Sequence, residues 1–361
     1  MFQDKYVFVQ LTAFLNRTQF NNYVRKYDGN RYVKHFTCWN QLLAMMFGQL
    51  SYRERLRDLI VALEAHRATQ YHLGLGRNTI VKGTLAYANQ TRDYRIFEDF
   101  AFYMMKEACK KRETSILNIP GKKYAFDSTT IPLCLATFPW AKFRSKKGGV
   151  KAHVLYDVEA QVPAFYTVTT ASKHDSTAMS SITYEPNRYY IFDRAYDTFK
   201  ELYKIHLTGS YYVVRSKTNL KYKMVKWKRR MPMNVLTDAE VKLTGYLSEK
   251  KYPESFRFIR YYDEEDDCEF TFLTNAKHLS ALDVANLYKK RWLVELFFKW
   301  LKQHLKIKRF WGTTKNAVRI QISVAIITYC LVAIVHHDMQ LKRSTYEVLQ
   351  ILSISLTDKP A

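Results

Sequence analysis

Residues 123–127, Lys123-Tyr-Ala-Phe-Asp127, lie where the helical spacing of apolar residues gives way to the short runs typical of β-strands. Two more strands are predicted at residues 149–157 and 163–169. The run Tyr189-Tyr-Ile-Phe-Asp193 predicts a fourth, fully apolar strand, with a helix after it through Leu202. This succession of strands and helices predicts an α/β fold with a mixed sheet.

Helical spacing dominates the chain before residue 115 and again from Ser280 onward. Further strand-like runs lie between these parts, in residues 210–275. We therefore predict three segments: an all-helical N-terminal domain over residues 1–115, an α/β domain over 116–340 with a β-rich insertion at about 210–275, and a C-terminal tail over 341–361.

A short polar turn in residues 74–79 leads into a helix rich in small residues. This pattern fits a helix-turn-helix, which would place Thr84, Tyr87 and Asn89 near a DNA groove. It fits an ordinary helical hairpin equally well.

The composition indicates a folded, strongly basic protein. The 361 residues include 57 Lys and Arg against 33 Asp and Glu, a formal charge of +24, and 47% of them are hydrophobic. The apolar share excludes a disordered chain, and the charge favours a polyanion partner, with nucleic acid the commonest. The alternative is a basic protein without such a partner.

The five cysteines are scattered, which disfavours a zinc site or a disulfide framework and favours a reducing, cytoplasmic setting. The longest apolar run, residues 322–335, is shorter than the ~20 residues that a membrane-spanning helix needs. We therefore predict a buried helix there and no membrane association.

Three carboxylates are candidates for chemistry. Asp127 and Asp193 each follow an apolar strand, and Glu295 is the single acid in residues 288–302. We predict one helix over those residues, apolar on most sides with a narrow charged stripe. A single Asp after a strand is usually a turn former. Three converging acids, however, suit Mg²⁺, and a pair of such ions can drive displacement at phosphorus.

Two basic elements accompany these acids. Arg291, Lys299 and Lys302 share the charged stripe with Glu295, where they would neutralise phosphates or, alternatively, pair with Glu295 along the helix. Residues 215–230 contain eight cations and no acid, with aromatic residues among them. Such a strip favours nucleic acid over a solvated face, and its candidate contacts are Arg215, Lys217 and Trp227.

These residues resemble the catalytic triad of DDE transposases encoded by bacterial insertion sequences: Asp127 in Phe-Asp-Ser-Thr-Thr, Asp193 in Phe-Asp-Arg-Ala-Tyr, and Glu295. The spacing from Tyr288 through Arg291 and Glu295 to Lys302 matches the Tyr-Arg-Glu-Lys signature of insertion sequence family four. The similarity covers about residues 120–335, and the helical first third also looks like the N-terminal domain of that family. We therefore expect residues 1–115 to be a helical DNA-binding domain that binds the end repeats, although the sequence does not name its contacts.

The resemblance implies an RNase H-like catalytic core with a β-rich insertion, in which the triad binds two Mg²⁺ ions and Mn²⁺ can substitute. It also implies a homodimer that acts on double-stranded DNA and excises the element through a hairpin. The residues implied near the cleaved DNA end are Tyr288, Arg291, Lys302, Trp292 and Lys299. Family members hold a flipped base with a tryptophan of the insertion, and Trp227 is the only tryptophan in residues 210–275.

We therefore predict a bacterial, cytoplasmic DNA transposase that associates with the nucleoid when it binds DNA. It would bind the terminal inverted repeats and target DNA and catalyse metal-dependent cleavage and strand transfer. One alternative is an RNase H-like nuclease without strand transfer. Another is a non-catalytic regulator derived from a transposase, which should have lost an acid, yet none is missing.

Overall fold

The structure is a computed structural model that describes residues 5–112, 117–145, 147–196, 198–216, 220–304, 307, 309–343 and 345–359. The chain forms two compact units. The helical unit comprises Met1–Glu113, Thr130–Val150 and Phe297–Ala361, and the sheet unit comprises Thr114–Thr129 and Lys151–Leu296. Residues close to both ends of the sequence therefore share one unit.

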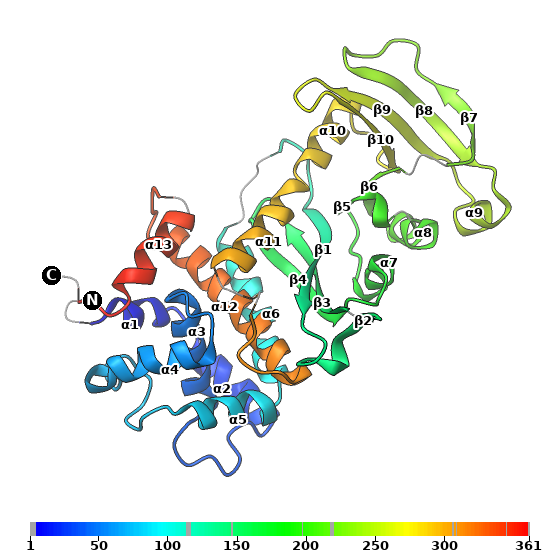
Figure 1. Ribbon diagram of the computed structural model, residues 1–361. Coiled ribbons are helices and arrows are strands. Elements are labelled where there is room, and N and C mark those ends of the chain that lie inside the picture. Colours follow the sequence, from blue (N-terminus) through cyan, green and yellow to red (C-terminus); the bar gives the residue numbers. More distant parts are fainter. Residues whose placement is uncertain are drawn as a thin grey trace. The chain divides into compact units, whose positions relative to one another are not determined.

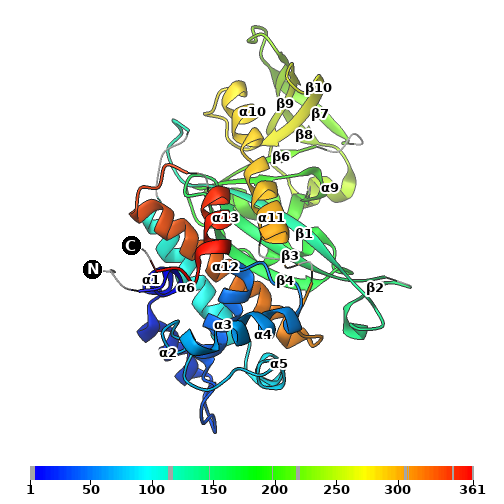
Figure 2. The same cartoon turned by 60° about the vertical axis from the view of Figure 1, so that its left-hand side comes forward.

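The helices of the helical unit come from both ends of the chain (Figure 1). They are α1 (Val7–Thr12), α2 (Arg17–Lys26), α3 (Cys38–Leu50), α4 (Leu56–Ala65), α5 (Lys82–Thr91), α6 (Arg95–Lys111), α12 (Lys315–Asp338) and α13 (Thr345–Ser355). Backbone N–H groups of Val7 and Phe8 donate to the carbonyls of Asp358 and Leu356, at 3.0 and 2.9 Å, so the two ends of the described chain lie side by side (Figure 2).

Helix α12 is the core of this unit, where it packs on α3 and α6. In the described part of the chain it is the one helix long and apolar enough to cross a membrane, but 94% of its apolar window is buried within the protein. The buried Thr328 of this helix donates to Gln49 Oε1 of α3 at 3.1 Å. The predicted buried helix is confirmed.

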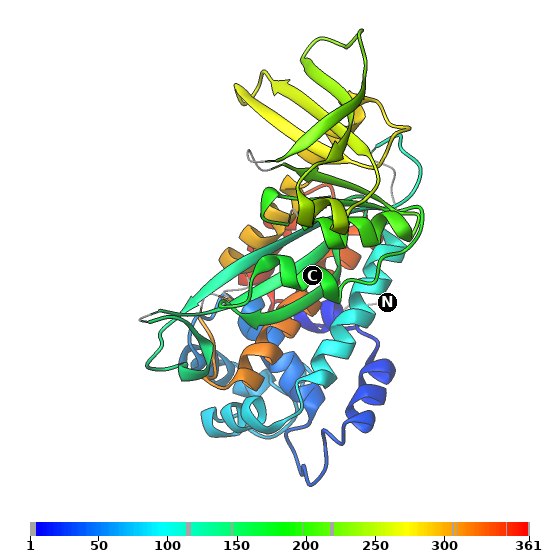
Figure 3. The ribbon, with the colours of Figure 1, turned by 90° about the vertical axis from the view of Figure 1, so that its right-hand side faces the viewer.

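The strands form one mixed sheet in the order β2-β3-β1-β5-β6-β10-β9-β8-β7, with β4 paired to β3 (Figure 3). The bounds are β1 (Lys123–Leu133), β2 (Lys142–Arg144), β3 (Lys147–Asp157), β4 (Val162–Thr170), β5 (Tyr189–Phe192), β6 (Tyr211–Arg215), β7 (Tyr222–Trp227), β8 (Val235–Leu243), β9 (Phe256–Asp263) and β10 (Cys268–Thr274). Short helices α7 (Asp175–Ala178), α8 (Phe199–Leu207) and α9 (Tyr246–Lys251) lie between strands. The strands predicted in residues 210–275 extend this same sheet.

Strands β1 and β5 are parallel neighbours, and Phe126 is in register with Phe192. Both phenylalanines are fully buried in one core cluster. The residues that follow them, Asp127 and Asp193, therefore leave the two strands at the same level. One expectation was wrong in detail: β1 does not end at Asp127 but continues to Leu133, so that Asp127 lies inside the strand where its partner β5 stops.

The predicted single helix over residues 288–302 is also wrong. Helix α10 (Ala281–Lys289) ends before Arg291, and α11 (Trp292–His304) begins after it. The apolar faces of α11 are largely buried as predicted, but Trp292 and Leu296 are 57% and 44% exposed. The exposed stripe of this helix therefore includes two large apolar side chains beside Glu295 and Lys299.

Candidate active site

The three predicted acids lie on three different elements of the sheet unit, and Arg291 joins two of them. Its guanidinium donates through Nη1 to Asp127 Oδ2 at 2.9 Å and through Nη2 to Glu295 Oε1 at 2.6 Å. Asp127 comes from β1 and Glu295 from the first turn of α11. The break between α10 and α11 places Arg291 where it can contact both.

Tyr288 brings the third acid into the same group. Its hydroxyl donates to Asp193 Oδ1 at 3.1 Å, and its ring centroid lies 5.7 Å from the Arg291 guanidinium. Burial and the negative charge of Asp193 raise the pKa of Tyr288 to about 12. Tyr288 is therefore a protonated hydrogen-bond donor at neutral pH. Five residues predicted from the sequence thus form one cluster.

Burial is the largest influence on the pKa of Asp127, and repulsion from the other two acids is a smaller one. Burial raises the pKa of Asp127 to about 6, the charges of Glu295 and Asp193 add to this rise, and the Ser128 N–H and Arg291 oppose it. The cluster holds three carboxylates and one guanidinium, so it has an excess of negative charge that a cation would offset.

A cavity of about 520 Å³ beside this cluster is lined by four of the predicted DNA contacts: Arg215, Tyr288, Arg291 and Trp292. The Arg215 guanidinium lies 4.8 Å from the ring centroid of Phe270, which lines the same cavity. Acidic residues of the β9–β10 turn line it too, and Lys289 neutralises part of their charge by bonds to Asp263 and Glu265 at about 3.0 Å. The cavity thus combines aromatic walls with two arginines.

Other predicted contacts lie elsewhere. Trp227 is 62% exposed on β7, the last strand of the sheet, and it is absent from the lining of this cavity. Lys299 is exposed one turn beyond Glu295 on α11, and Lys302 is half-buried two turns beyond it. Lys217 lies outside the described residues.

Comparison with known proteins supplies the family. Residues 120–331, more than half of the chain, match the model of the transposase DDE domain, and all three acids of the cluster lie within the match. The chain belongs to this transposase family. Residues 3–76 match a domain of unknown function.

Two relatives illustrate the membership. The chain is 35% identical over 234 residues to y4zB of Sinorhizobium fredii, which is named as a transposase, and the match covers 63% of this chain. It is 29% identical over 246 residues, 68% of this chain, to a probable transposase for insertion sequence element IS5377 of Geobacillus stearothermophilus. The aligned part of the chain spans 64% of the length of each relative.

A solved structure shows the same fold. The piggyBac transposase synaptic complex with hairpin DNA superposes with a TM-score of 0.50 at 12% sequence identity, covering 98% of this chain and 81% of that chain. At this identity the likeness concerns the fold alone, which confirms the predicted RNase H-like mixed sheet.

A fourth carboxylate, Asp175, contacts the segment that carries Asp127. The Ser128 backbone N–H donates to Asp127 Oδ1 at 2.7 Å, and the Ser128 hydroxyl donates to Asp175 Oδ1 at 2.6 Å. Lys151 also donates to Asp175 Oδ1, at 3.0 Å. Burial alone would raise the pKa of Asp175, but the bonds from Ser128 and Lys151 lower it below its usual value. Asp175 therefore stays charged and holds the segment that carries Asp127.

His153 lies behind this network. Its side chain is fully buried, its Nε2 lies 3.0 Å from Thr169 Oγ1, and its Nδ1 lies 3.9 Å from Asp175 Oδ1. Burial lowers the pKa of His153 to about 4, so the ring is neutral at pH 7. The acid in His174-Asp175 was visible in the sequence, but its contact with Ser128, 47 residues away, was not.

The residues of the cluster fit a hard divalent cation in their chemistry, because they offer carboxylate oxygens from three elements and an excess of negative charge. DDE transposase domains generally use such ions. Within the described ranges, no three His, Cys, Asp or Glu side chains are arranged as a ready metal site. Arg291 already engages one oxygen of Asp127 and one of Glu295.

Proposed function

We propose that the chain is a DNA transposase that binds the terminal inverted repeats of its insertion sequence and catalyses metal-dependent cleavage and strand transfer. The observation that carries this proposal is the cluster of Asp127, Asp193 and Glu295 around Arg291 and Tyr288, inside the part of the chain that matches the transposase family. Clustered acids on an RNase H-like sheet support phosphoryl transfer rather than DNA binding alone.

Asp127, Asp193 and Glu295 are the residues that would hold two Mg²⁺ ions, or Mn²⁺ in their place. Bound there, the ions supply an activated water or 3′-hydroxyl and stabilise the leaving oxygen. The pKa of about 6 means that Asp127 is mostly ionised at pH 7 and above, the form that binds cations.

The chain's own cations and donors would position the DNA. Arg291 orients two of the acids and lines the cavity beside them, where its positive charge would attract a phosphate. The neutral Tyr288 hydroxyl donates a hydrogen bond to Asp193 and so holds this carboxylate in place. Lys299 and Lys302 continue along α11 and would contact phosphates beside the cleaved end.

A hairpin route of excision is supported by the cavity beside the acids. A hairpin displaces bases from the duplex, and Trp292, Phe270 and Arg215 offer aromatic and guanidinium surfaces to a displaced base. We further propose that a homodimer acts on the paired ends in the bacterial cytoplasm and that Trp227 and Lys217 belong to the DNA surface.

The test uses DNA that carries the element's ends, incubated with the protein in Mg²⁺ or in chelator. We expect nicking at the end, a hairpin product and joining of the 3′ end to target DNA. Glu295→Gln should lose all three but retain end binding, whereas Glu64→Gln, an exposed acid on α4, should behave as wild type.

Each failure has a distinct meaning. Robust cleavage by Glu295→Gln would refute the assignment of Asp127, Asp193 and Glu295 as the catalytic acids. Cleavage without joining would favour the nuclease, and tight end binding without cleavage in any divalent metal would favour the regulator.

A further inference from the structure

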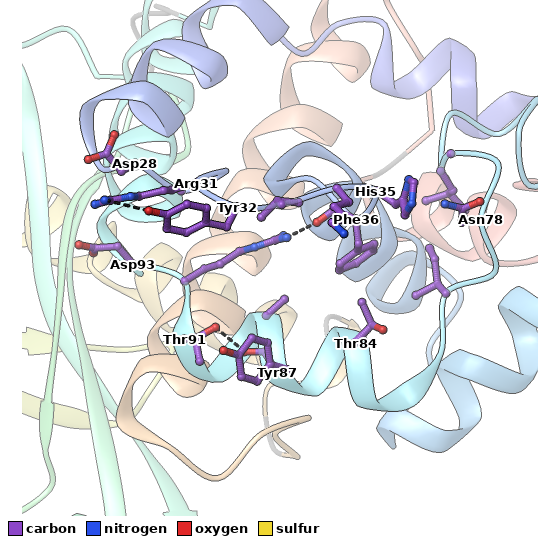
Figure 4. Close-up of a pocket in the computed structure, with 18 of the residues that line it drawn as sticks. Asp28, Arg31, Tyr32, His35, Phe36, Asn78, Thr84, Tyr87, Thr91 and Asp93 are labelled. Carbon is purple, nitrogen blue, oxygen red and sulfur yellow. Dashed lines mark hydrogen bonds between the residues drawn. The ribbon is translucent and has the colours of Figure 1, made fainter.

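A second cavity, of about 990 Å³, lies within the helical unit (Figure 4). Three segments line it: residues 27–36 of the loop between α2 and α3, residues 75–80 before α5, and one face of α5 with the residues after it. It lies in the N-terminal part of the chain, most of which matches a domain of unknown function.

The charge around this cavity is positive and available to a ligand. Arg31, Lys34 and Arg77 are exposed, and in the described part of the chain none of them forms an ion pair. Two acids line the cavity. Asp93 forms an ion pair with Arg95, whose Nη2 lies 2.5 Å from Asp93 Oδ2, which leaves Asp28 as the other acid. Arg31 donates to the Tyr32 hydroxyl at 3.2 Å, and the Arg77 guanidinium lies 4.8 Å from the Tyr71 ring centroid, so both contact aromatic groups rather than acids. Within the described ranges, lining cations without an acid partner outnumber Asp28 and give an anion-binding surface.

Two exposed tyrosines face this cavity. Tyr32 is 89% exposed on the loop, and Tyr87 is 69% exposed on α5. Figure 4 shows them on the two walls of the hollow. Large aromatic side chains left in solvent cost hydrophobic burial, and paired with cations they suit a ligand with both phosphates and flat rings.

The loop that carries Tyr32 is held in an unusual conformation. Asp28 and Tyr32 have φ of 50° and 59°, in the left-handed region that residues with a side chain seldom adopt. Hydrogen bonds keep this shape: Asn30 Oδ1 accepts from the Cys38 N–H at 2.8 Å, and the Gly29 N–H donates to the Val24 carbonyl at 2.9 Å. The backbone that carries Tyr32 and Arg31 is therefore fixed before binding, which reduces the ordering cost to that of the side chains.

The opposite wall is equally fixed. Thr84, Tyr87 and Thr91 follow one face of α5 toward the cavity. The other face is anchored, since Asn89 is buried and its Oδ1 accepts from Gln41 Nε2 at 2.7 Å. Thr84 and Tyr87 thus line a hollow, as the helix-turn-helix alternative expected, whereas Asn89 has a structural role.

We propose that this cavity binds the duplex DNA of the element's ends. Arg31, Lys34 and Arg77 contact backbone phosphates, and Tyr32 and Tyr87 contact sugars and base edges. The identity of the DNA rests on the proposed function; the binding of a phosphate polymer rests on the cavity itself.

The test measures binding of the full-length protein to a fluorescent duplex of the terminal repeat and to a scrambled duplex, over a range of salt. The cavity variant is Arg31→Ala/Lys34→Ala/Arg77→Ala. The matched control, Arg57→Ala/Arg67→Ala/Lys106→Ala, removes three exposed cations of the same unit that do not line the cavity. Thermal unfolding checks folding, and the Lys substitutions Arg31→Lys/Arg77→Lys restore charge.

We expect the cavity variant to bind about 10- to 100-fold more weakly, with a salt slope smaller by about three, while the control changes little. Tyr32→Ala should reduce the preference for the terminal repeat, and Tyr32→Phe should retain most of it. Equal losses in the two triple variants would overturn the proposal. If wild type binds the ends through the cavity but never cleaves them, the transposase proposal fails and this one stands.

Discussion

Arg291 and Arg77 are both placed to meet DNA phosphates, but their surroundings are opposite. The Arg291 side chain is 14% exposed and donates to two carboxylates, whereas Arg77 is exposed at the rim of a cavity without an acid partner. The first cation is part of a prearranged group, in which it already pairs with two of the three carboxylates. The second is available for an external phosphate, so its effect should depend strongly on salt.

The difference between the two arginines distinguishes residues that affect catalysis from residues that affect DNA binding. A cation that is paired with the acids, as Arg291 is, holds their side chains in place and should affect the rate of cleavage. Cations that are free should affect affinity for the ends. Substitutions near the three acids should therefore change the cleavage rate, and substitutions at the second cavity should change the affinity for DNA.

Asp127→Asn should lower cleavage on the order of 10³-fold and yet stabilise the fold at pH 7. The folded-state pKa of about 6 lies above the ordinary value of 3.8, so the fold favours the neutral carboxyl, and wild-type stability falls as pH rises through 6. An amide removes this cost, about 1–3 kcal/mol. Thermal unfolding at pH 7, pH 4.5 and pH 3 tests it, because the advantage should shrink between pH 6 and pH 4 and vanish only below the unfolded pKa of 3.8.

Arg291→Ala should lower cleavage about 100-fold and destabilise the protein by about 2–4 kcal/mol, because two half-buried carboxylates lose their shared partner. Arg260→Ala is the control, since the Arg260–Glu269 pair is exposed and should contribute less than about 1 kcal/mol. Unfolding in urea measures both. An equal loss of stability in the two variants would mean that Arg291 is no more than another surface cation.

Asp175→Asn should lower cleavage about 10-fold while end binding is unchanged, since it weakens the network that holds Asp127. Ser128→Ala removes the donor of the same bond and should have a similar effect. The double variant should be no worse than either single one, because both act through one contact. Additive losses in the cleavage rate would refute that contact as the shared cause.

Arg77→Ala alone should weaken binding to the ends only a few-fold, with a salt slope smaller by about one and a normal cleavage rate once DNA is saturating. Arg57→Ala should leave the slope unchanged. A slope that moves as much in Arg291→Ala as in Arg77→Ala would erase the distinction between the two regions.

Local patterns allowed much of this molecule to be predicted from its sequence. The change of apolar period at residue 123 predicted the strands, and the parallel runs that end in Phe126-Asp127 and Phe192-Asp193 predicted that two acids would lie together. The break between α10 and α11 was not predictable, because Lys290 keeps helical dihedral angles (φ −67°, ψ −14°) and no Pro or Gly interrupts the run.

The sequence by itself determined the order of elements, the acids, the excess of cations and the likeness to transposases, because these depend on residue type and spacing along the chain. Only the tertiary structure decided that Arg291 reaches Asp127 across 164 residues, that Asp175 bonds Ser128, and that Arg31, Arg77 and Tyr87 surround one cavity. Such contacts depend on strand register and side-chain direction, which packing between distant segments fixes and no single segment encodes.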